Sequence, residues 1–174
     1  LEFRRVLFRS RAKDESLLDW EYLGILFKHP NPDIQNIEVP QFFPLEDKWV
    51  LITTPPGLSE YYVGDFDAKT GEFTPETTGI MDYSGHFFAP NSLVDLDDQR
   101  VMWGWIRGFQ PGNGWNGVLT VPRVLRLTEA NHLEFRPYEG LEKLRGPKYQ
   151  TENLTLLNGS VILDEARGNS LEIK

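Results

Sequence analysis

One carboxylic acid, Glu38, stands where its neighbours favour acid–base chemistry. It follows the apolar Ile37 and precedes Val39–Leu45, a run that holds two prolines and two phenylalanines. A carboxyl enclosed by aromatic and aliphatic side chains is poorly solvated as an anion, so it retains its proton more readily. Proton donors for glycosidic oxygens are built in this way. The alternative for this residue alone is an ordinary glutamate at the start of a strand.

Tryptophans supply the second group of candidate residues. Trp103 and Trp105 are two positions apart on a predicted strand, so both side chains point to the same face. Trp105 is the best candidate for stacking on the apolar face of a sugar ring, and Trp103 and Trp115 are weaker candidates. The alternative for each of them is packing between sheets.

Composition limits the class of partner. The chain has 174 residues, a net charge of −8, 40% hydrophobic and 13% aromatic residues, three histidines and no cysteine. The negative charge argues against nucleic acid, an anionic membrane surface or a polyanionic substrate, and a neutral oligo- or polysaccharide fits better. His29, His86 and His132 lack metal-ligand spacing, so we expect no metal site and no cofactor.

The elements that must position these residues are short strands. Aromatic and β-branched runs alternate with Gly, Asp, Asn and Pro turns, and helical periodicity is nearly absent. The strands predicted at Tyr61–Phe66 and Glu72–Thr74 are joined by an Asp-to-Gly hairpin loop, Asp67–Gly71. The predicted strands are Trp20–Leu23, Val39–Phe43, Trp49–Thr53, Tyr61–Phe66, Glu72–Thr74, His86–Val94, Arg100–Ile106, Gly117–Leu127 and His132–Arg136.

The four predicted strands between residues 39 and 74 and the four between residues 86 and 136 resemble each other in sequence. Phe42-Phe43-Pro44 and the turn before Trp49 are matched, about 50 residues later, by Phe87-Phe88-Ala89-Pro90 and the turn before Trp103. Repeats of about 40–50 residues with four strands each are typical of propeller blades. Two hairpin pairs of a β-sandwich are the alternative.

The chain divides into four segments. Residues 1–10 alternate arginine with bulky apolar residues and contain no Met, so we interpret them as a non-native scar outside the fold and expect the chain to be a fragment. Residues 11–137 then hold the later blades, and 138–149 a linker with a helical turn ended by Gly-Pro. Residues 150–174 open a further β-unit, with strands at 152–157, 160–163 and 171–173. The sequence does not indicate a cellular location.

The order of motifs from about residue 14 onward resembles glycoside hydrolase family 32, the invertases, levanases and inulinases. Glu38-Val39-Pro40-Gln41 is similar to the family's Glu-Cys-Pro-Asp motif. The motifs that resemble the family's later segments are Tyr61–Asp67, Asp82–Pro90, Trp103–Trp105, Gly114–Arg123 and Leu141–Arg145.

The resemblance implies an all-β fold: a five-bladed β-propeller, here partial, followed by the first strands of a C-terminal β-sandwich. It also implies cleavage of terminal β-fructofuranosyl bonds in sucrose or fructans by a retaining double displacement, with Glu38 as general acid/base. Asp82 and Phe88 would lie near the sugar, although Asp82 suits a turn better and Phe88 stands where the family often has Tyr. Arg123 suits an ion pair with a carboxylate.

Two departures from the family pattern bear on activity. Val39 and Gln41 replace the motif's Cys and Asp, so we expect a working acid with a shifted pH optimum. The family's Asn-Asp-Pro nucleophile motif and its Arg-Asp-Pro motif do not occur in these 174 residues, so we expect this chain alone to be inactive. The competing interpretations are a family 43-like arabinan or xylan hydrolase and a non-catalytic carbohydrate-binding propeller.

Overall fold

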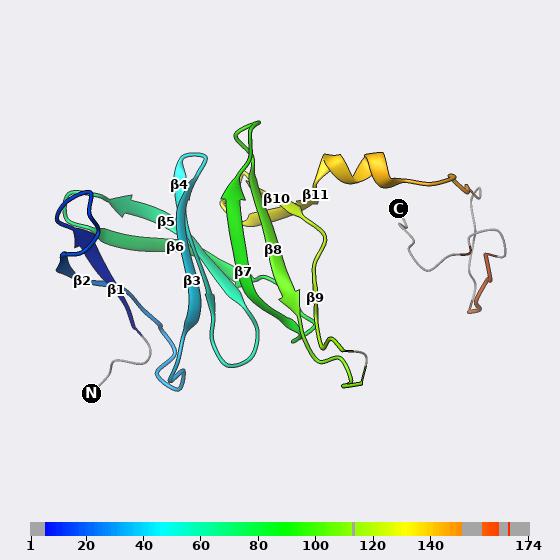
Figure 1. Cartoon of the computed structure of the whole chain (residues 1–174), viewed down its shortest axis with the longest axis horizontal. Helices are drawn as coiled ribbons and strands as arrows, with labels where there is room; N and C mark the ends of the chain where they lie inside the picture. Colours follow the sequence, from blue (N-terminus) through cyan, green and yellow to red (C-terminus); the bar gives the residue numbers. More distant parts are fainter. Residues whose placement is uncertain (1–5, 113, 151–157, 164–166, 168–174) are drawn as a thin grey trace. The chain divides into compact units, whose positions relative to one another are not determined.

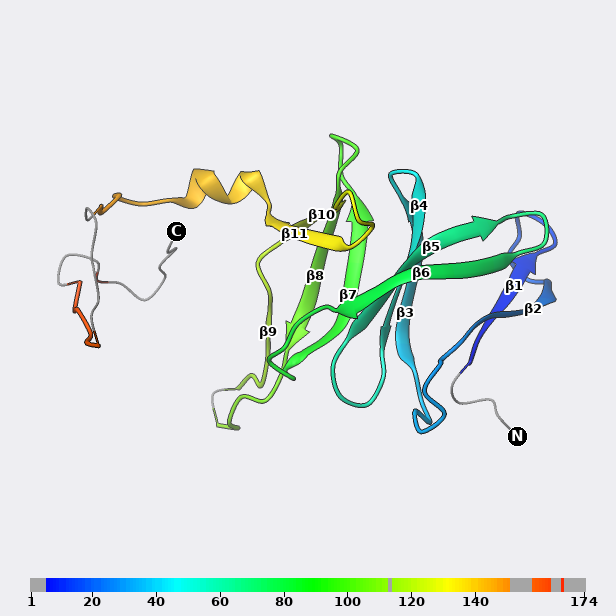
Figure 2. The same cartoon turned by 180° about the vertical axis from the view of Figure 1, so that it is seen from behind.

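The computed structural model describes residues 6–112, 114–150, 158–163 and 167. The chain forms two compact units, Leu1–Tyr138 and Glu139–Lys174. The described part of the first unit is a series of antiparallel sheets (Figures 1 and 2). Its strands are β1 (Val6–Ala12), β2 (Trp20–Lys28), β3 (Glu38–Leu45), β4 (Lys48–Thr54), β5 (Glu60–Asp67), β6 (Glu72–Ile80), β7 (Phe87–Val94), β8 (Arg100–Ile106), β9 (Val118–Leu119), β10 (Arg123–Leu127) and β11 (Leu133–Pro137).

These strands make three sheets. The first is the hairpin β1-β2, the second is the four-stranded meander β3-β4-β5-β6, and the third has the order β7-β8-β10-β11 with β9 paired to β8. The third sheet therefore repeats the up-and-down order of the second. Such repeated four-stranded meanders are the units from which propellers are assembled.

The second sheet is buried on both faces because β4 carries a continuous apolar run. Val50 and Ile52 point to one face, where they join the third sheet's Met102 and Leu125 in one core. Leu51 lies between them in sequence and points to the opposite face, as the two-residue period of a strand requires. There it packs with a second core that includes Phe27 of β2, Ile37, Tyr62 and Phe73.

An identical irregularity interrupts the first strand of both the second and the third sheet. In β3, Glu38 pairs with Thr54 but Gln41 pairs with Ile52, so β3 contains one extra residue. In β7, Phe88 pairs with Trp105 and Asn91 with Trp103, which is the same offset. These are β-bulges, which bend a strand and change the direction of a side chain.

The bulged residues have a left-handed backbone. Val39 has a φ of 48° and Ala89 a φ of 50°, and each is followed by a proline. Proline lacks a backbone N–H, so it is compatible with a position where the ladder is interrupted. The equivalent residues of the two sheets are therefore Glu38-Val39-Pro40-Gln41 and Phe88-Ala89-Pro90-Asn91, and the pairing of Phe42–Pro44 with Phe87–Pro90 predicted from the sequence is wrong.

Gln41 ties the second sheet to the third. Its Oε1 accepts hydrogen bonds from the Ser92 backbone N–H at 3.1 Å and from the Ser92 hydroxyl at 3.0 Å. Arg100 donates to the same hydroxyl at 3.1 Å, and its guanidinium lies 4.1 Å from the ring centroid of Phe43. These polar bonds add direction to the apolar contacts between the two sheets, and further polar bonds such as that of Ser59 with Phe87 join them elsewhere.

Several strand boundaries differ from the predicted ones. The strand expected over Gly117–Leu127 is divided into β9 and β10, because the Thr120 hydroxyl accepts from the Gly104 backbone N–H and Pro122 precedes β10. The strand β6 continues to Ile80, past Pro75, which is tolerated because β6 lies at a sheet edge.

Residues 6–10 belong to the fold, so the expectation that the first ten residues lie outside it is wrong for these five. They form most of β1 and pair with β2. The Arg9 guanidinium also donates to the backbone carbonyls of Leu23 and Thr70, at 3.1 and 3.3 Å.

The second unit begins with a 3-10 helix over Glu139–Leu144, which agrees with the helical turn expected in the linker. Residues 158–163 form no strand, so the expected strand over 160–163 is not found. The expected strand segments at 152–157 and 171–173 lie outside the described residues. No helix in the described ranges is long and apolar enough to span a membrane.

Asp82 occupies the connection between the second and third sheets. Its Oδ1 accepts from the Ser84 backbone N–H at 2.9 Å, and its Oδ2 lies 3.6 Å from Nη2 of Arg123 on β10. Burial alone would raise the pKa of Asp82, but the hydrogen bonds from Ser84 and the charge of Arg123 together hold the pKa of that carboxyl below its ordinary value. Asp82 therefore holds a turn, as expected, and it is also the carboxylate partner expected for Arg123.

We predict that Asp82 makes stability depend on acid pH. Because its pKa is lower in the folded state, the ionised carboxyl contributes stability above about pH 3.9, and this contribution is lost as the pH falls through the folded pKa. Asp82→Asn should lower the free energy of unfolding at pH 7 and flatten its decline between about pH 4 and pH 2. Urea titrations over this pH range test the prediction, with Arg123→Met as a variant that removes only the cation. Parallel curves for wild type and Asp82→Asn would contradict it.

We also predict a large effect of core truncation in the third sheet. Leu125 is completely buried, so Leu125→Ala should reduce the free energy of unfolding by about 2–5 kcal/mol, through lost burial and a residual cavity. Leu96→Ala is the matched control, because Leu96 lies fully exposed in the β7–β8 hairpin and such a change costs at most about 0.5 kcal/mol. Equal urea midpoints for the two variants would show that the inter-sheet core is not formed.

Candidate functional site

A small pocket lies where the first strands of the second and third sheets begin. Its volume is about 180 Å³, and Glu38 of β3 and Phe88 of β7 both line it. These two residues precede the two equivalent bulges, so the same local backbone geometry delivers both side chains to one place. The remaining lining residues are Thr54, Pro55, Pro56 and Arg107.

The Glu38 carboxyl is more open than the sequence predicted. Glu38 is exposed, and its Oε1 accepts a hydrogen bond from Nδ2 of Asn36. The aromatic residues that follow it do not enclose it, because Phe42 packs on Trp49, Phe66 and Phe73 on the far face of the second sheet. The Glu38 side chain therefore lines the pocket with one of its oxygens bonded by the Asn36 amide.

Phe88 and Arg107 make part of the pocket lining aromatic and cationic. The rings of Phe88 and Trp105 meet edge to face, with centroids 6.1 Å apart and an interplanar angle of 83°. The Arg107 guanidinium lies over the Phe88 ring, 4.6 Å from its centroid. Trp105 is 36% exposed, so part of its indole face is open for stacking against a ligand.

Polar bonds also hold the β4–β5 loop that forms the third wall. The hydroxyls of Thr54 and Ser59 lie 3.1 Å apart, and the Ser59 hydroxyl donates to the Phe87 carbonyl at 3.2 Å. Thr54 and Ser59 are buried. The loop carrying Pro55 and Pro56 is therefore fixed against the strand that carries Phe88.

Trp105 contacts Phe88 but lies outside the lining of this pocket, and so do the remaining predicted residues. Trp103 is half-buried and pairs with Asn91, and Trp115 packs on Phe109 with centroids 5.1 Å apart. Asp82 is engaged by Ser84 and Arg123 as described above. A direct contact of Asp82 or Trp103 with substrate stays a prediction.

Arg107 is the charged lining residue that was not predicted from the sequence, and Thr54, Pro55 and Pro56 are the uncharged ones. Arg107 directly follows β8, which ends at Ile106, so strand periodicity does not place its side chain. Its position in the pocket becomes evident only when the third sheet is placed next to the second.

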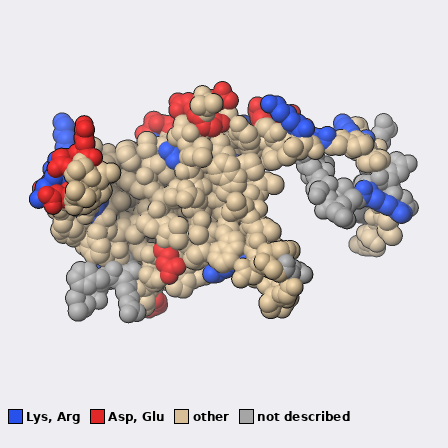
Figure 3. Space-filling model, in the orientation of Figure 1, with Lys and Arg blue, Asp and Glu red and all other residues tan. Residues whose placement is uncertain are grey.

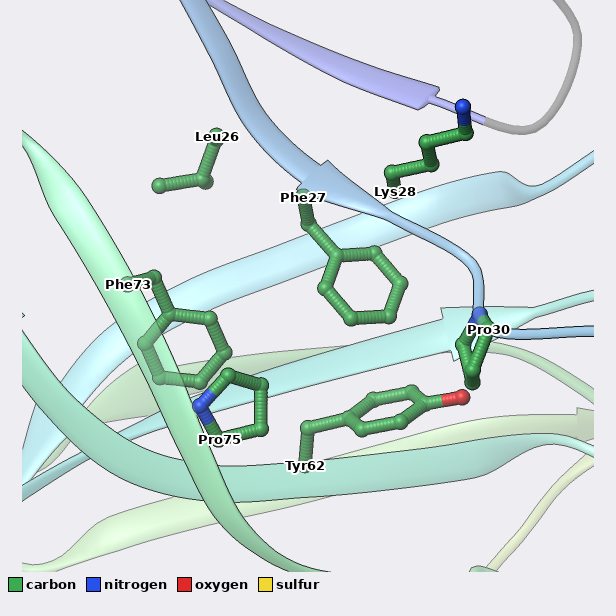
Figure 4. Close-up of a pocket in the computed structure, with 7 residues that line it drawn as sticks. All are labelled: Leu26, Phe27, Lys28, Pro30, Tyr62, Phe73 and Pro75. Atoms are coloured by element: carbon green, nitrogen blue, oxygen red, sulfur yellow. The ribbon is translucent and has the colours of Figure 1, made fainter.

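A second cavity, of about 320 Å³, lies between β2 and the second sheet. The rings of Phe27, Tyr62 and Phe73 gather around it (Figure 4). Its lining contains Lys28 but no carboxylate. The first cavity contains Glu38 and is therefore the candidate catalytic site, although it is the smaller of the two.

A buried polar cluster adjoins this second cavity. Glu60 Oε1 lies 2.6 Å from Nε2 of the buried His29 and accepts from the Tyr62 hydroxyl at 2.8 Å. Burial, followed by the hydrogen bond and charge of Glu60, raises the pKa of Tyr62 well above its ordinary value. The cluster anchors the segment between β2 and Glu38 to β5, so it is a structural support of the site.

Negative charge gathers away from the pocket. Figure 3 shows Asp and Glu side chains over the β3–β4 and β7–β8 hairpins, which are the opposite ends of β3 and β7 from Glu38 and Phe88. Among the described residues, no group of three or more His, Asp or Glu side chains is arranged to hold a metal ion. The pocket therefore combines one carboxyl, one guanidinium and aromatic surface, a set suited to a saccharide.

Comparison with known proteins agrees with this geometry. The sequence model of the Glycosyl hydrolases family 32 N-terminal domain matches residues 4–137. A sucrose-6-phosphate hydrolase of Staphylococcus xylosus is 28% identical over 156 residues, which are 80% of this chain and 31% of that protein. A levanase of Bacillus sp. strain L7 is 28% identical over 119 residues, 58% of this chain and 13% of the levanase.

Solved structures give the same result. The family 32 β-fructofuranosidase BmSUC1 of Bombyx mori superimposes with a TM-score of 0.68 at 25% identity, covering 82% of this chain and 36% of that one. Fructan 1-exohydrolase IIa of Cichorium intybus has a TM-score of 0.67 at 22% identity, covering 82% and 32%, and this likeness concerns the fold. The predicted all-β propeller class is confirmed. The chain spans about a third of the length of the first sucrose-6-phosphate hydrolases that it matches, and it belongs to glycosyl hydrolase family 32.

Proposed function

We propose that the complete protein hydrolyses terminal β-fructofuranosyl bonds by a retaining double displacement, with Glu38 as the general acid/base. The observation that carries this proposal is the presence of Glu38, in the position of the family's Glu-Cys-Pro-Asp motif, in a pocket at the start of β3. The similar proteins named above act on sucrose phosphate, levan or other β-fructofuranosides, by their names.

The proposed mechanism uses Glu38 twice. In the first step its carboxyl donates a proton to the glycosidic oxygen while a second carboxylate attacks the anomeric carbon. In the second step the Glu38 carboxylate accepts a proton from water, which then releases the fructosyl group. Retaining enzymes place the two carboxyl groups about 5–5.5 Å apart. By the resemblance the nucleophile is the Asp of an Asn-Asp-Pro motif, which this chain does not contain.

Phe88 of the pocket and the adjacent Trp105 assist binding. Trp105 offers part of its indole face for stacking on a sugar, and Phe88 fixes the orientation of that indole through their edge-to-face contact. A neutral substrate, sucrose or a fructan, fits the net charge of −8. Because the match is to family 32, an arabinan or xylan hydrolase is disfavoured. A non-catalytic sugar-binding propeller is the competing function.

The acid/base role predicts a specific dependence on the leaving group. In the enzyme made from the complete gene, Glu38→Gln should lower kcat/KM for sucrose by about 10²–10⁴-fold, because an amide cannot protonate the departing glucose. The loss should be much smaller for a β-fructofuranoside with a nitrophenol leaving group, which departs without a proton. Glu46→Gln makes the same change at the opposite end of β3 and should retain wild-type rates with both substrates.

Two outcomes would contradict the proposal. Equal losses on sucrose and on the nitrophenyl substrate would remove Glu38 from the proton-transfer role. A wild-type enzyme that binds fructosides but releases no fructose would favour the sugar-binding function instead.

A further inference from the structure

The feature that carries a further inference is Arg107. Its backbone N–H donates to the His86 carbonyl at 3.0 Å, so the residue is attached to the segment that precedes β7. The next residue is Gly108, with a φ of 94°, and the His86 ring occupies the space that a Cβ at position 108 would need. The backbone at residue 107 is therefore held in place by its neighbours on both sides.

The Arg107 side chain is oriented by an aromatic ring. Its guanidinium lies over the face of Phe88, and Phe88 is itself braced by the edge-to-face contact with Trp105. A guanidinium stacked on a ring directs its N–H groups outward in its own plane. These donors are thus available at the edge of the pocket that Glu38 also lines.

Arg107 has no acidic partner in the part of the chain that the structure describes. Some arginines of that part pair with carboxylates, as Arg11 does with Glu21 and Arg123 with Asp82. Arg9, Arg100 and Arg126 donate to neutral oxygens instead. Arg107 is also the one cation among the residues that line the Glu38 pocket. A half-buried guanidinium beside a pocket satisfies its N–H groups best with ligand oxygens.

We propose that Arg107 is a substrate-binding residue that donates hydrogen bonds to a saccharide oxygen beside the bond that Glu38 cleaves. This inference rests on the proposed function. Phe88 carries no donor, and it stands where related enzymes often have Tyr. The guanidinium placed over its ring supplies donors that the phenyl group lacks.

The first test removes the donor in the enzyme made from the complete gene. Arg107→Leu should lower kcat/KM for sucrose about ten-fold or more, as expected for the loss of hydrogen bonds from a charged group, and Arg107→Lys should restore part of it. Arg126→Leu is the matched control, because Arg126 lies on β10 and bonds Gln99. Unchanged kcat/KM in Arg107→Leu would overturn the inference.

A second variant separates substrate binding from a structural role. Adding Phe88→Tyr to Arg107→Leu returns a hydroxyl donor to the wall of the pocket and should recover part of the lost kcat/KM. A residue that only supported the fold would show no such rescue, and its loss would appear in the melting temperature. Failure of the rescue, with a lowered melting temperature in Arg107→Leu, would assign Arg107 to structure.

The acceptor is identified by comparing sucrose with sucrose 6-phosphate. Equal losses in Arg107→Leu indicate a hydroxyl common to both substrates, and a larger loss on sucrose 6-phosphate indicates the phosphate group. Each of these results supports a substrate contact. If the wild-type enzyme releases fructose from neither substrate, the proposed function fails. If the wild-type enzyme is active and Arg107→Leu matches its kcat/KM on both substrates, only the role of Arg107 fails.

Discussion

The candidate site depends on one backbone feature that occurs twice, a β-bulge with its first residue in a left-handed conformation. Val39 is that residue in β3, and Ala89 is that residue in β7. A β-branched residue such as Val39 adopts a positive φ at a cost of about 1–3 kcal/mol. Val39 is exposed, so its own side-chain packing does not offset this cost. The bulge is held by the pairing on either side of it, Glu38 with Thr54 and Gln41 with Ile52. Without the bulge, the regular alternation along β3 would direct the Glu38 side chain to the opposite face of the sheet.

The two bulges act together because the second and third sheets pack face to face. The sheets share a core that contains Val50, Ile52, Met102 and Leu125. Gln41, which follows Pro40, adds hydrogen bonds to Ser92. Gln41 replaces the Asp of the family motif, and its amide oxygen has a structural use in this chain. A pocket lined by both Glu38 and Phe88 therefore requires that the sheets keep their register.

Strand positions were largely predictable from sequence because β-branched and aromatic runs end at strong turn residues such as Asp67–Gly71. Features that depend on contacts between distant segments were not. The exposure of Glu38 follows from Phe42 packing on the far face of the sheet, and the cation at the pocket follows from Arg107 meeting Phe88. The unusual composition of residues 6–10 predicts that they lie outside the fold, yet they pair with β2. The number of blades and the sandwich after residue 149 stay predictions.

The central claim, that Glu38 protonates the leaving group in a retaining mechanism, is tested most directly by chemical rescue of Glu38→Ala in the enzyme made from the complete gene. Azide is a strong nucleophile that needs no general base, and it fits the space left by the missing carboxyl. With an activated β-fructofuranoside, azide should accelerate turnover and yield the β-fructosyl azide, because two displacements retain configuration. No acceleration, or a product of inverted configuration, would contradict the account.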